Sequence, residues 1–338
     1  MNADAGAAPV AQVSELSVHF RRSGFRPGDT TPAVLRAVDG VSFNVAAGQT
    51  VGLVGESGSG KSTVARAILG LQKPTTGSVR VFGVDVAHMR GAQQRTVRRQ
   101  MQAVFQDPYA SLNAFKTVHD IIAQPLQVHH LLPSRARPAR VAELLSMVGL
   151  DPQFADRYPR DFSGGQRQRI AIARALASEP QFVVLDEPLS SLDVSIQAQI
   201  VNLLLDLRET LGLTYLFIAH DLSVVRLISD EVVVMYAGRV MERAPADDLF
   251  ANPLHPYTLA LIGAIPLPDP ETRRVAAPIA ERASGSQQAA TTGCPFRTRC
   301  AFAKAACAED PDLVEGKPRH FVSCHFWTEV REKSVGTI

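Results

Sequence analysis

The chain has 338 residues, of which 46% are hydrophobic, so it can bury one large or two modest apolar cores. Its 35 lysines and arginines nearly balance 33 aspartates and glutamates, which provides no general basic field and argues against a nucleic-acid partner. The opening residues, MNADAGAAPVAQ, have neither the basic nor the apolar region of a secretory signal. Every apolar run is far shorter than the roughly 20 residues that cross a bilayer, so we do not expect the chain to span a membrane.

A glycine-rich loop, GESGSGKST, occupies residues 55–63. The run QTVGLVG (49–55) before it has the pattern of a strand, and apolar residues recur at helical spacing over 62–71. Glycines let successive backbone amides point at phosphate oxygens, and the helix N-terminus adds its dipole. Lys61 supplies a positive charge for the β and γ phosphates, and the Ser62 hydroxyl can reach Mg²⁺. The predicted ATP-binding residues of the loop are Gly55, Glu56, Ser57, Gly58, Ser59, Gly60, Lys61, Ser62 and Thr63.

Short apolar runs indicate parallel strands, and hairpin patterns elsewhere indicate antiparallel ones. FVVLD (182–186) and LTYLFIAH (213–220) read as buried parallel strands, and the helical pattern over 195–210 supplies the crossover. Segments near residues 80 and 235 predict hairpins that turn at Phe-Gly and Ala-Gly, which suggests a small antiparallel piece.

The middle of the chain, residues 107–179, has a helical pattern, and we interpret it as a helical subdomain inserted into an α/β core. Breaks are expected at Pro125, Pro133, Pro138 and Pro159.

An Asp-Glu pair, Asp186 and Glu187, lies at the end of the apolar run FVVLD. A carboxylate at a strand end can hold Mg²⁺ directly or through water, and the next one can orient or deprotonate an attacking water. The alternative is a helix N-cap. The phosphate loop upstream favours the catalytic interpretation.

Two motifs follow the phosphate loop in a distinctive order, FSGGQ (162–166) and then VVLDEP (183–188). Their order resembles the ATP-binding subunits of ABC transporters, over about residues 13–270. The resemblance implies an α/β fold with a P-loop NTPase core of the ABC ATPase type, antiparallel β and inserted helical subdomains, within a domain of residues 1–265. It also implies hydrolysis of ATP with Mg²⁺ in a dimer that ATP closes.

The resemblance assigns roles beyond the loop. Gln106, in VFQDPYASLN, would sense the γ phosphate and join Ser62 and Asp186 at Mg²⁺. His220, in FIAHD, would contact the γ phosphate and the water beside Glu187.

Other residues would act on the adenine or across the dimer. Phe20 would stack on adenine, with a core residue as the alternative. A serine and glycines that open the helix RQRIAIARALA form a second anion-binding N-terminus, although the same pattern alone would be an ordinary N-cap. The residues implied to bind ATP of the opposite subunit are Ser163, Gly164, Gly165, Gln166 and Asp193.

Longer identities, among them LDVSIQAQI and HPYT (255–258), resemble the oligopeptide/dipeptide importer branch. The branch implies a complex with a second ATP-binding subunit (a paralogue or a copy of this chain), two transmembrane permease subunits and an external peptide-binding protein. The chain would then lie peripherally on the cytoplasmic face of the cell membrane. Selectivity for one solute would reside in the other subunits, so peptides or related small solutes remain possible cargo.

The cysteines are confined to the end of the chain. After residue 265 the composition becomes rich in Pro, Ala, Ser and Gln, which predicts a linker over 266–293 and a cysteine-rich extension over 294–338. Four thiolates can hold an iron–sulfur cluster or a tetrahedral zinc, whereas disulfides are not expected in a reducing cytosol. Paired Cys-x-x-Cys knuckles are absent, and the spacing resembles the tails of this branch, which implies a 4Fe-4S cluster, with Zn²⁺ or four unrelated thiols as alternatives. The predicted ligands are Cys294, Cys300, Cys307 and Cys324.

Two other classes of function are alternatives to a transport ATPase. A regulatory or repair-type ATPase of the same superfamily would usually carry a coiled-coil insertion or tandem cassettes, and the sequence shows neither. A redox-sensing module would make the cysteine tail primary and the ATPase secondary.

Overall fold

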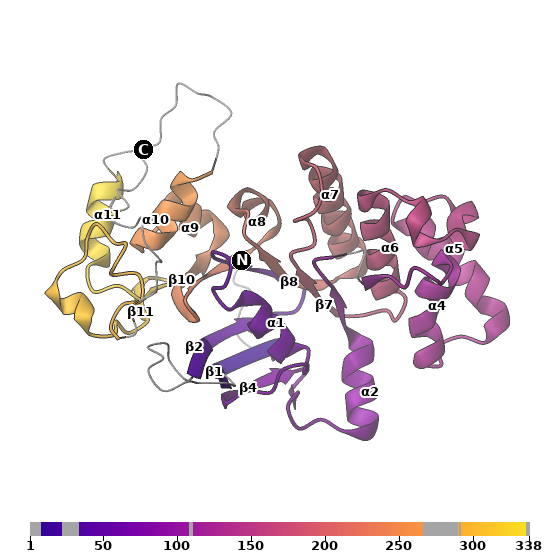
Figure 1. Ribbon diagram of the computed structural model, residues 1–338, viewed down its shortest axis with the longest axis horizontal. Helices are drawn as coiled ribbons and strands as arrows, with labels where there is room; N and C mark the ends of the chain where they lie inside the picture. Colours follow the sequence, from indigo (N-terminus) through magenta and orange to yellow (C-terminus); the bar gives the residue numbers. More distant parts are fainter. Residues whose placement is uncertain (1–7, 22–33, 108–110, 266–289, 291, 336–338) are drawn as a thin grey trace, which may run out of the picture.

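The computed structural model describes residues 8–21, 34–107, 111–265, 290 and 292–335. The predicted linker and the segment between the first two strands therefore lie almost wholly outside the described residues. Figure 1 shows an elongated arrangement: the helical subdomain forms one end, the C-terminal segment forms the other, and the sheets lie between them. None of the described helices combines the length and apolar character that a bilayer crossing requires.

A small antiparallel sheet has the order β2-β1-β4-β5. Phe82 and Gly83 have φ of 51° and 76°, which is the geometry of a tight hairpin turn and confirms the predicted Phe-Gly hairpin. The strands are β1 (Ala11–Arg21), β2 (Val34–Val45), β4 (Thr76–Val81) and β5 (Val84–Asp85).

The main sheet has the order β11-β12-β10-β9-β3-β8-β7-β6. Pairing is parallel from β9 through β6 and antiparallel from β9 through β11. The Ala-Gly hairpin is confirmed, but both of its strands, β9 and β10, lie in this sheet and not in the small antiparallel one. The strands are β3 (Thr50–Val54), β6 (Met101–Val104), β7 (Phe182–Asp186), β8 (Thr214–Ala219), β9 (Glu231–Tyr236), β10 (Arg239–Pro245), β11 (Val314–Lys317) and β12 (His320–Val322).

The central strands are buried on both faces, as their continuous apolar runs predict. Alternate residues enter opposite cores because side chains of a strand alternate between its faces: Val184 packs toward the small sheet, and Val183 and Leu185 pack toward the helices. The remaining helices are α1 (Lys61–Ile68), α2 (Gly91–Gln100), α7 (Val194–Leu211), α8 (Leu222–Ile228), α9 (Ala246–Ala251), α10 (Pro256–Gly263) and α11 (Trp327–Val335).

The helical subdomain consists of α4 (Val118–Val128), α5 (Arg137–Met147) and α6 (Gly164–Leu176). The expected break at Pro125 is wrong, because this proline lies within α4. Thr117 caps the helix start, and burial of Ile121, Ile122 and Leu126 offsets the hydrogen bond that the proline removes. Short 3₁₀ helices cover Ser134–Ala136, Pro152–Asp156, Pro159–Asp161 and Ala305–Ala308.

Candidate nucleotide-binding site

The phosphate loop connects β3 to α1, as predicted. Gly55 and Gly60 have φ of 149° and 102°, values that disfavour any side chain. A Cβ on Gly55 would lie 2.1 Å from the Met235 carbonyl, and one on Gly60 would lie 2.3 Å from that of Ala37. The loop is therefore held tightly between β2 and the end of β9.

Lys61 folds back over this loop. Its Nζ donates to the carbonyls of Gly55 at 2.7 Å and Glu56 at 2.9 Å, and it lies 3.3 Å from Ser59 Oγ. Burial lowers the pKa of Lys61, while Glu187, Asp186 and Glu56 act in the opposite direction. The Lys61 ammonium group is thus held by loop carbonyls, at the place where we expect the phosphates to bind.

Asp186 lies at the end of β7, opposite the start of α1. The Ser62 hydroxyl donates to its Oδ1 at 3.1 Å. Burial raises the pKa of Asp186, the Ser62 hydrogen bond lowers it, and the neighbouring Glu187 raises it. Hydroxyl and carboxylate oxygens at this spacing suit Mg²⁺, which prefers few protein ligands and keeps several waters.

Glu187 joins the other predicted catalytic residues. Gln106 donates from Nε2 to Glu187 Oε2 at 2.9 Å, and His220 Nδ1 lies 3.6 Å from the same oxygen. Glu187 and His220 also line a pocket with Gln197. Gln106, which is 81 positions before Glu187, and His220 therefore meet at one carboxylate.

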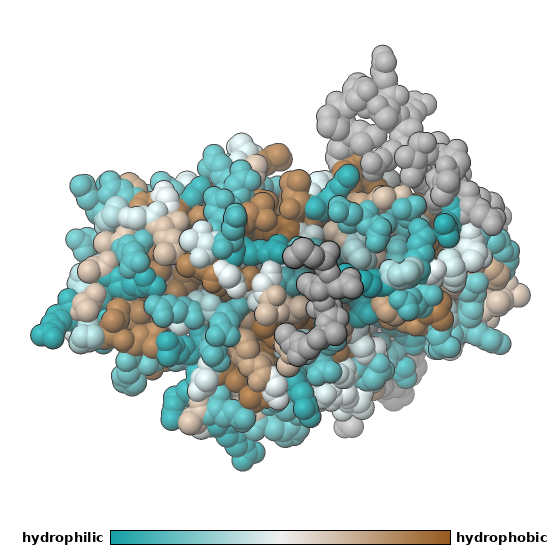
Figure 2. Space-filling model, turned by 180° about the vertical axis from the view of Figure 1, so that it is seen from behind, coloured by the Kyte–Doolittle hydropathy of each residue, from teal (hydrophilic) through white to brown (hydrophobic). Residues whose placement is uncertain are grey.

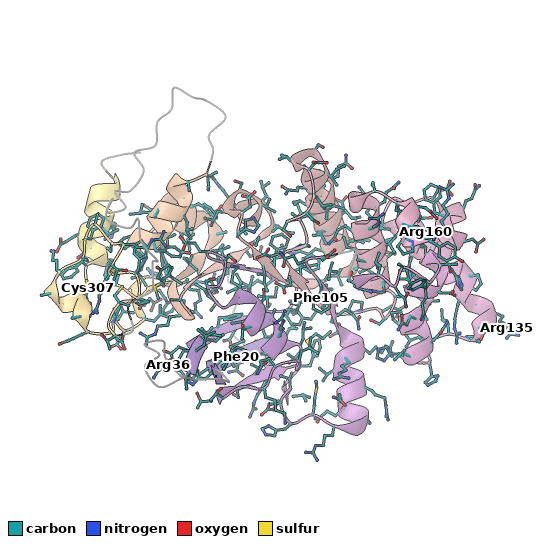
Figure 3. The ribbon with its side chains drawn as sticks, viewed as in Figure 1. Phe20, Arg36, Phe105, Arg135, Arg160 and Cys307 are labelled. Carbon is teal, nitrogen blue, oxygen red and sulfur yellow. The ribbon has the colours of Figure 1, made fainter. Side chains whose placement is uncertain are left out.

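Phe20 lies on β1 in the small sheet, apart from the helical subdomain (Figure 3), and 40% of its surface is exposed. The exposure excludes the alternative of a core residue. Its role at the adenine stays a prediction.

The residues predicted to bind ATP of the opposite subunit form a separate group, here called the signature group: Ser163, Gly164, Gly165, Gln166 and Asp193. Ser163 caps α6: its hydroxyl accepts from the Gln166 amide at 3.4 Å, and the Gln166 side chain accepts from the Ser163 amide at 3.0 Å. A Cβ on Gly165 would lie 2.5 Å from Ile196 on α7, whose N-cap is Asp193. The fold thus brings the five predicted trans residues together. Among the described residues, no hydrogen bond joins them to the phosphate loop of the same chain.

Two residues at the loop were missed by the sequence interpretation. The Glu56 amide donates to the Tyr257 hydroxyl at 2.8 Å, and the Glu56 carboxylate pairs with the Arg299 guanidinium at 2.8 and 2.9 Å. In the sequence, HPYT indicated only a resemblance to the importer branch, and no local signal marks Arg299.

The cysteines line one cavity together with His255, Phe296 and Phe326. Burial raises the pKa of Cys300 to about 11 and that of Cys324 to about 12. Within the described residues, however, no three His, Cys, Asp or Glu side chains are arranged to hold a metal ion. The predicted metal site is therefore not confirmed. The four cysteines that converge on the cavity are Cys294, Cys300, Cys307 and Cys324.

This fold and this site define a P-loop ATPase with a helical subdomain and a C-terminal extension. The ABC transporter family matches residues 38–190, and the family named oligopeptide/dipeptide transporter, C-terminal region, matches residues 241–307. The chain belongs to the ATP-binding proteins of ABC transporters, in the oligopeptide transport branch. It is an ATP-hydrolysing protein of that family.

Two relatives and one solved structure illustrate the similarity. The oligopeptide transport ATP-binding protein AppF of Bacillus subtilis is 50% identical, over 87% of this chain and 90% of its own length. OppF of Salmonella typhimurium, another oligopeptide transport ATP-binding protein, is 48% identical, over 93% of this chain and 95% of its own length. The dimeric ATP-binding cassette MJ0796, bound to ADP and Pi, superposes with a TM-score of 0.62 at 29% identity, over 70% of this chain and 98% of its own.

Proposed function

We propose that this chain hydrolyses ATP to power import of oligopeptides or dipeptides through a membrane ABC transporter. One observation carries the proposal: Gln106 and His220 converge on Glu187, next to Asp186 and the phosphate loop, in a chain that also has the C-terminal region of the peptide-transport branch. The regulatory-ATPase and redox-sensor alternatives have no comparable support. AppF and OppF are both named as oligopeptide transport ATP-binding proteins, and this chain matches each of them over nearly its full length.

The residues divide the work of phosphoryl transfer. The loop amides and Lys61 hold the triphosphate, and Ser62, Asp186 and Gln106 would hold Mg²⁺, which neutralises charge that develops on the transferred phosphoryl group. Glu187 accepts a proton from the attacking water, while Gln106 and His220 orient that water from either side.

The signature group acts on the ATP of a second ATP-binding subunit. Ser163 and the amides of Gly164 and Gly165 open a 13-residue helix and can bind a γ phosphate. Gln166 and Asp193 flank this position, and Phe20 stacks on the adenine of its own site. The dimeric arrangement of MJ0796 supports a shared site.

Two permease subunits and an external peptide-binding protein complete the proposed complex, with this chain peripheral on the cytoplasmic face of the membrane. Exposed aromatic side chains at the helical subdomain support a docking surface: 93% of Phe115 and 38% of Phe105 are exposed, and Figure 3 places Phe105 at the junction between sheet and helices. On the rear of the molecule, hydrophobic residues also gather over this subdomain among polar ones (Figure 2).

The cysteine cavity holds a 4Fe-4S cluster, or alternatively Zn²⁺, in this proposal. The proposal is supported by four thiols that line one apolar cavity, although no three side chains of the described residues are arranged to hold a metal ion. The test is iron, sulfide and zinc analysis of anaerobically purified protein. A metal content well below one site per chain would contradict both occupants.

Reconstitution tests the transport function. The chain, its companion ATPase and permeases are placed in liposomes with a peptide-binding protein, and peptide uptake is measured with ATP. Uptake that depends on ATP and stops with Glu187→Gln is expected. Peptide-independent ATP hydrolysis by a chain that never associates with a permease would contradict import.

A further inference from the structure

The C-terminal segment, residues 292–335, reaches the phosphate loop through Arg299. Its two terminal nitrogens pair with both carboxylate oxygens of Glu56 at 2.8 and 2.9 Å, and only 14% of the Arg299 side chain is exposed. Glu56 is also one of the carboxylates that interact with Lys61. A bidentate arginine pair is stronger and more directional than a simple charge contact. The pair therefore neutralises a carboxylate next to the expected triphosphate.

An aromatic cluster packs against the pair formed by Arg299 and Glu56. The Tyr257 ring lies 4.8 Å from Tyr236 and 5.3 Å from Phe296, and Arg299 lies 5.8 Å above Tyr236 and 5.5 Å above Phe296. The Tyr257 hydroxyl accepts the Glu56 amide, so both ends of Glu56 are held by residues outside the loop. Aromatic and cation–π packing of this kind limits the positions that Arg299 can take.

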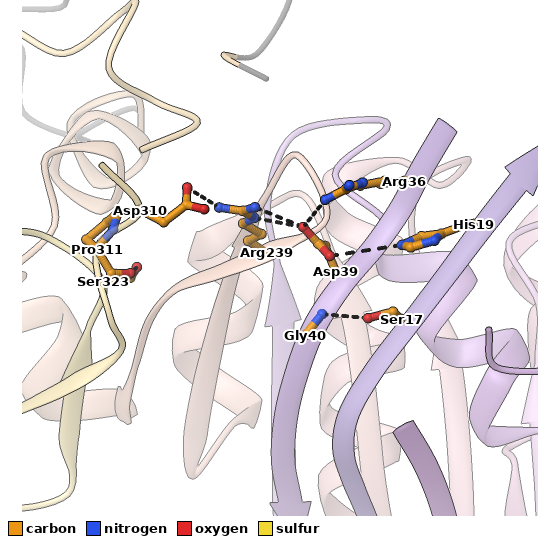
Figure 4. Close-up of polar contacts among 9 residues, drawn as sticks. All are labelled: Ser17, His19, Arg36, Asp39, Gly40, Arg239, Asp310, Pro311 and Ser323. Carbon is orange, nitrogen blue, oxygen red and sulfur yellow. Dashed lines mark hydrogen bonds and ion pairs between the residues drawn. The ribbon is translucent and has the colours of Figure 1, made fainter. Parts of the chain in front are cut away.

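A second arginine connects the segment to the adenine side of the site. Arg239 donates to Asp39 on β2 at 2.9 Å and to Asp310 at 2.7 Å, as Figure 4 shows. Asp39 also lies 4.0 Å from His19, the residue before Phe20. The turn before Arg239 bonds to the loop itself, because the Gly238 amide donates to the Ser59 carbonyl at 3.0 Å.

Arg299 is connected to the cysteine cavity through the adjacent residue in the chain and through backbone hydrogen bonds. Arg299 precedes Cys300, and its amide donates to the Phe296 carbonyl at 3.0 Å. The Cys294 amide donates to the Cys307 carbonyl at 3.0 Å. A change in the packing of the cavity therefore acts directly on Arg299.

We propose that Arg299 is a positioning residue of the ATP site, and that the cysteine segment sets nucleotide affinity by neutralising Glu56 and holding the phosphate loop. The inference rests on the proposed ATP site but concerns a contact that ATP hydrolysis does not itself require. Thermodynamic linkage makes this effect reciprocal. If attachment of the segment raises the affinity for nucleotide by some factor, nucleotide binding must favour the attached state of the segment by the same factor.

Nucleotide titration of full-length variants tests the contact. Arg299→Ala leaves an unpaired carboxylate beside the triphosphate, so the Kd for Mg-ATP is expected to rise about tenfold, within the usual range of coupling between sites. The KM for ATP should rise by a similar factor with kcat changed much less, and the effect should shrink at high salt because charge repulsion is screened. Arg299→Lys retains a charge without the bidentate geometry and should fall between wild type and Arg299→Ala.

Two further variants separate this role from ordinary stabilisation. Glu315→Gln removes an exposed charge on β11 within the same segment and should leave Kd unchanged. The double variant Arg299→Ala with Glu56→Gln removes the unpaired charge and should bind Mg-ATP more tightly than Arg299→Ala alone. A structural defect would not be relieved in this way.

Hydrogen exchange provides the reciprocal measurement. Mg-ATP should slow amide exchange over residues 294–310 in Glu187→Gln, and this protection should be lost when Arg299→Ala is added. Wild-type affinity of Arg299→Ala, or an equal loss in Glu315→Gln, would overturn the inference. Failure of the wild-type chain to bind Mg-ATP would instead overturn the proposed function.

Discussion

Glu187 lies in the left-handed region with φ of 48°, which is costly for a residue with a side chain. Its amide donates to the Ile218 carbonyl at 3.0 Å, so the neighbouring strand β8 holds the conformation. The turn aims the carboxylate at Gln106 and His220 instead of continuing along β7. Backbone strain is thus located at the residue that we propose as the base.

At the residue scale, Glu187→Gln is expected to abolish most hydrolysis. The amide is nearly the same size and can still bond to Gln106, but it cannot take a proton from water. The rate of phosphate release should fall by about 10²- to 10⁴-fold, the usual contribution of a general base. A phosphate-release assay at saturating Mg-ATP measures it.

Binding of a fluorescent ATP analogue to the same variant should persist. Glu209→Gln, an exposed substitution on α7, is the matched control and should hydrolyse at the wild-type rate. Near-normal turnover by Glu187→Gln would exclude Glu187 as the base.

At the element scale, one buried carboxylate joins three elements. Glu242 on β10 is fully buried, accepts the amides of Leu254 and His255 at the start of α10, and pairs with His320 on β12 at 2.6 Å. These contacts attach the C-terminal strands and the Tyr257 helix to the main sheet. A single change at Glu242 therefore disturbs the attachment of both α10 and β12 to the main sheet.

We expect Glu242→Gln to lower the free energy of unfolding by about 3 kcal/mol. The amide supplies one acceptor oxygen where the carboxylate supplies two, and its NH₂ faces a donor, which leaves buried groups unpaired. Urea unfolding followed by fluorescence of Trp327, the single tryptophan, reports the C-terminal segment directly.

Glu315→Gln, an exposed change on β11, should alter the unfolding free energy by less than about 0.5 kcal/mol. Equal stability of Glu242→Gln and Glu315→Gln would show that the buried carboxylate does not attach the segment.

At the scale of the whole molecule, the phosphate loop and the signature group are the two proposed half-sites of one chain. We expect Glu187→Gln to sediment as a dimer with Mg-ATP, alone or with its companion ATPase, because each half-site completes the other. Adding Ser163→Arg should leave it monomeric, since a long cation would occupy the α6 N-terminus that meets the partner's ATP. Sedimentation velocity with and without Mg-ATP makes the measurement.

Ser146→Arg, exposed on α5 of the same subdomain, controls for added charge and should still dimerise. Stoichiometric Mg-ATP binding by a chain that remains monomeric, with or without the companion, would contradict the shared site.

Motif residues were predictable because their chemistry is encoded locally. The phosphate loop, the Asp186-Glu187 pair and the Ser163 cap each need a few consecutive residues in one turn or helix end, and the structure places them in these settings. The Ala-Gly hairpin was predicted for the same reason. Its membership in the main sheet was not, because parallel pairing of β9 with β3 depends on contacts about 180 residues apart.

The sequence by itself determined the ATPase class, the loop that binds phosphate and the helical subdomain, since periodicity and short motifs carry that information. Only the tertiary structure decided that Arg299 pairs with Glu56, 243 residues away, that Glu242 attaches the C-terminal strands, and that Pro125 stays inside a helix. Long-range pairs depend on how separate elements pack, and no local preference of either residue encodes its partner.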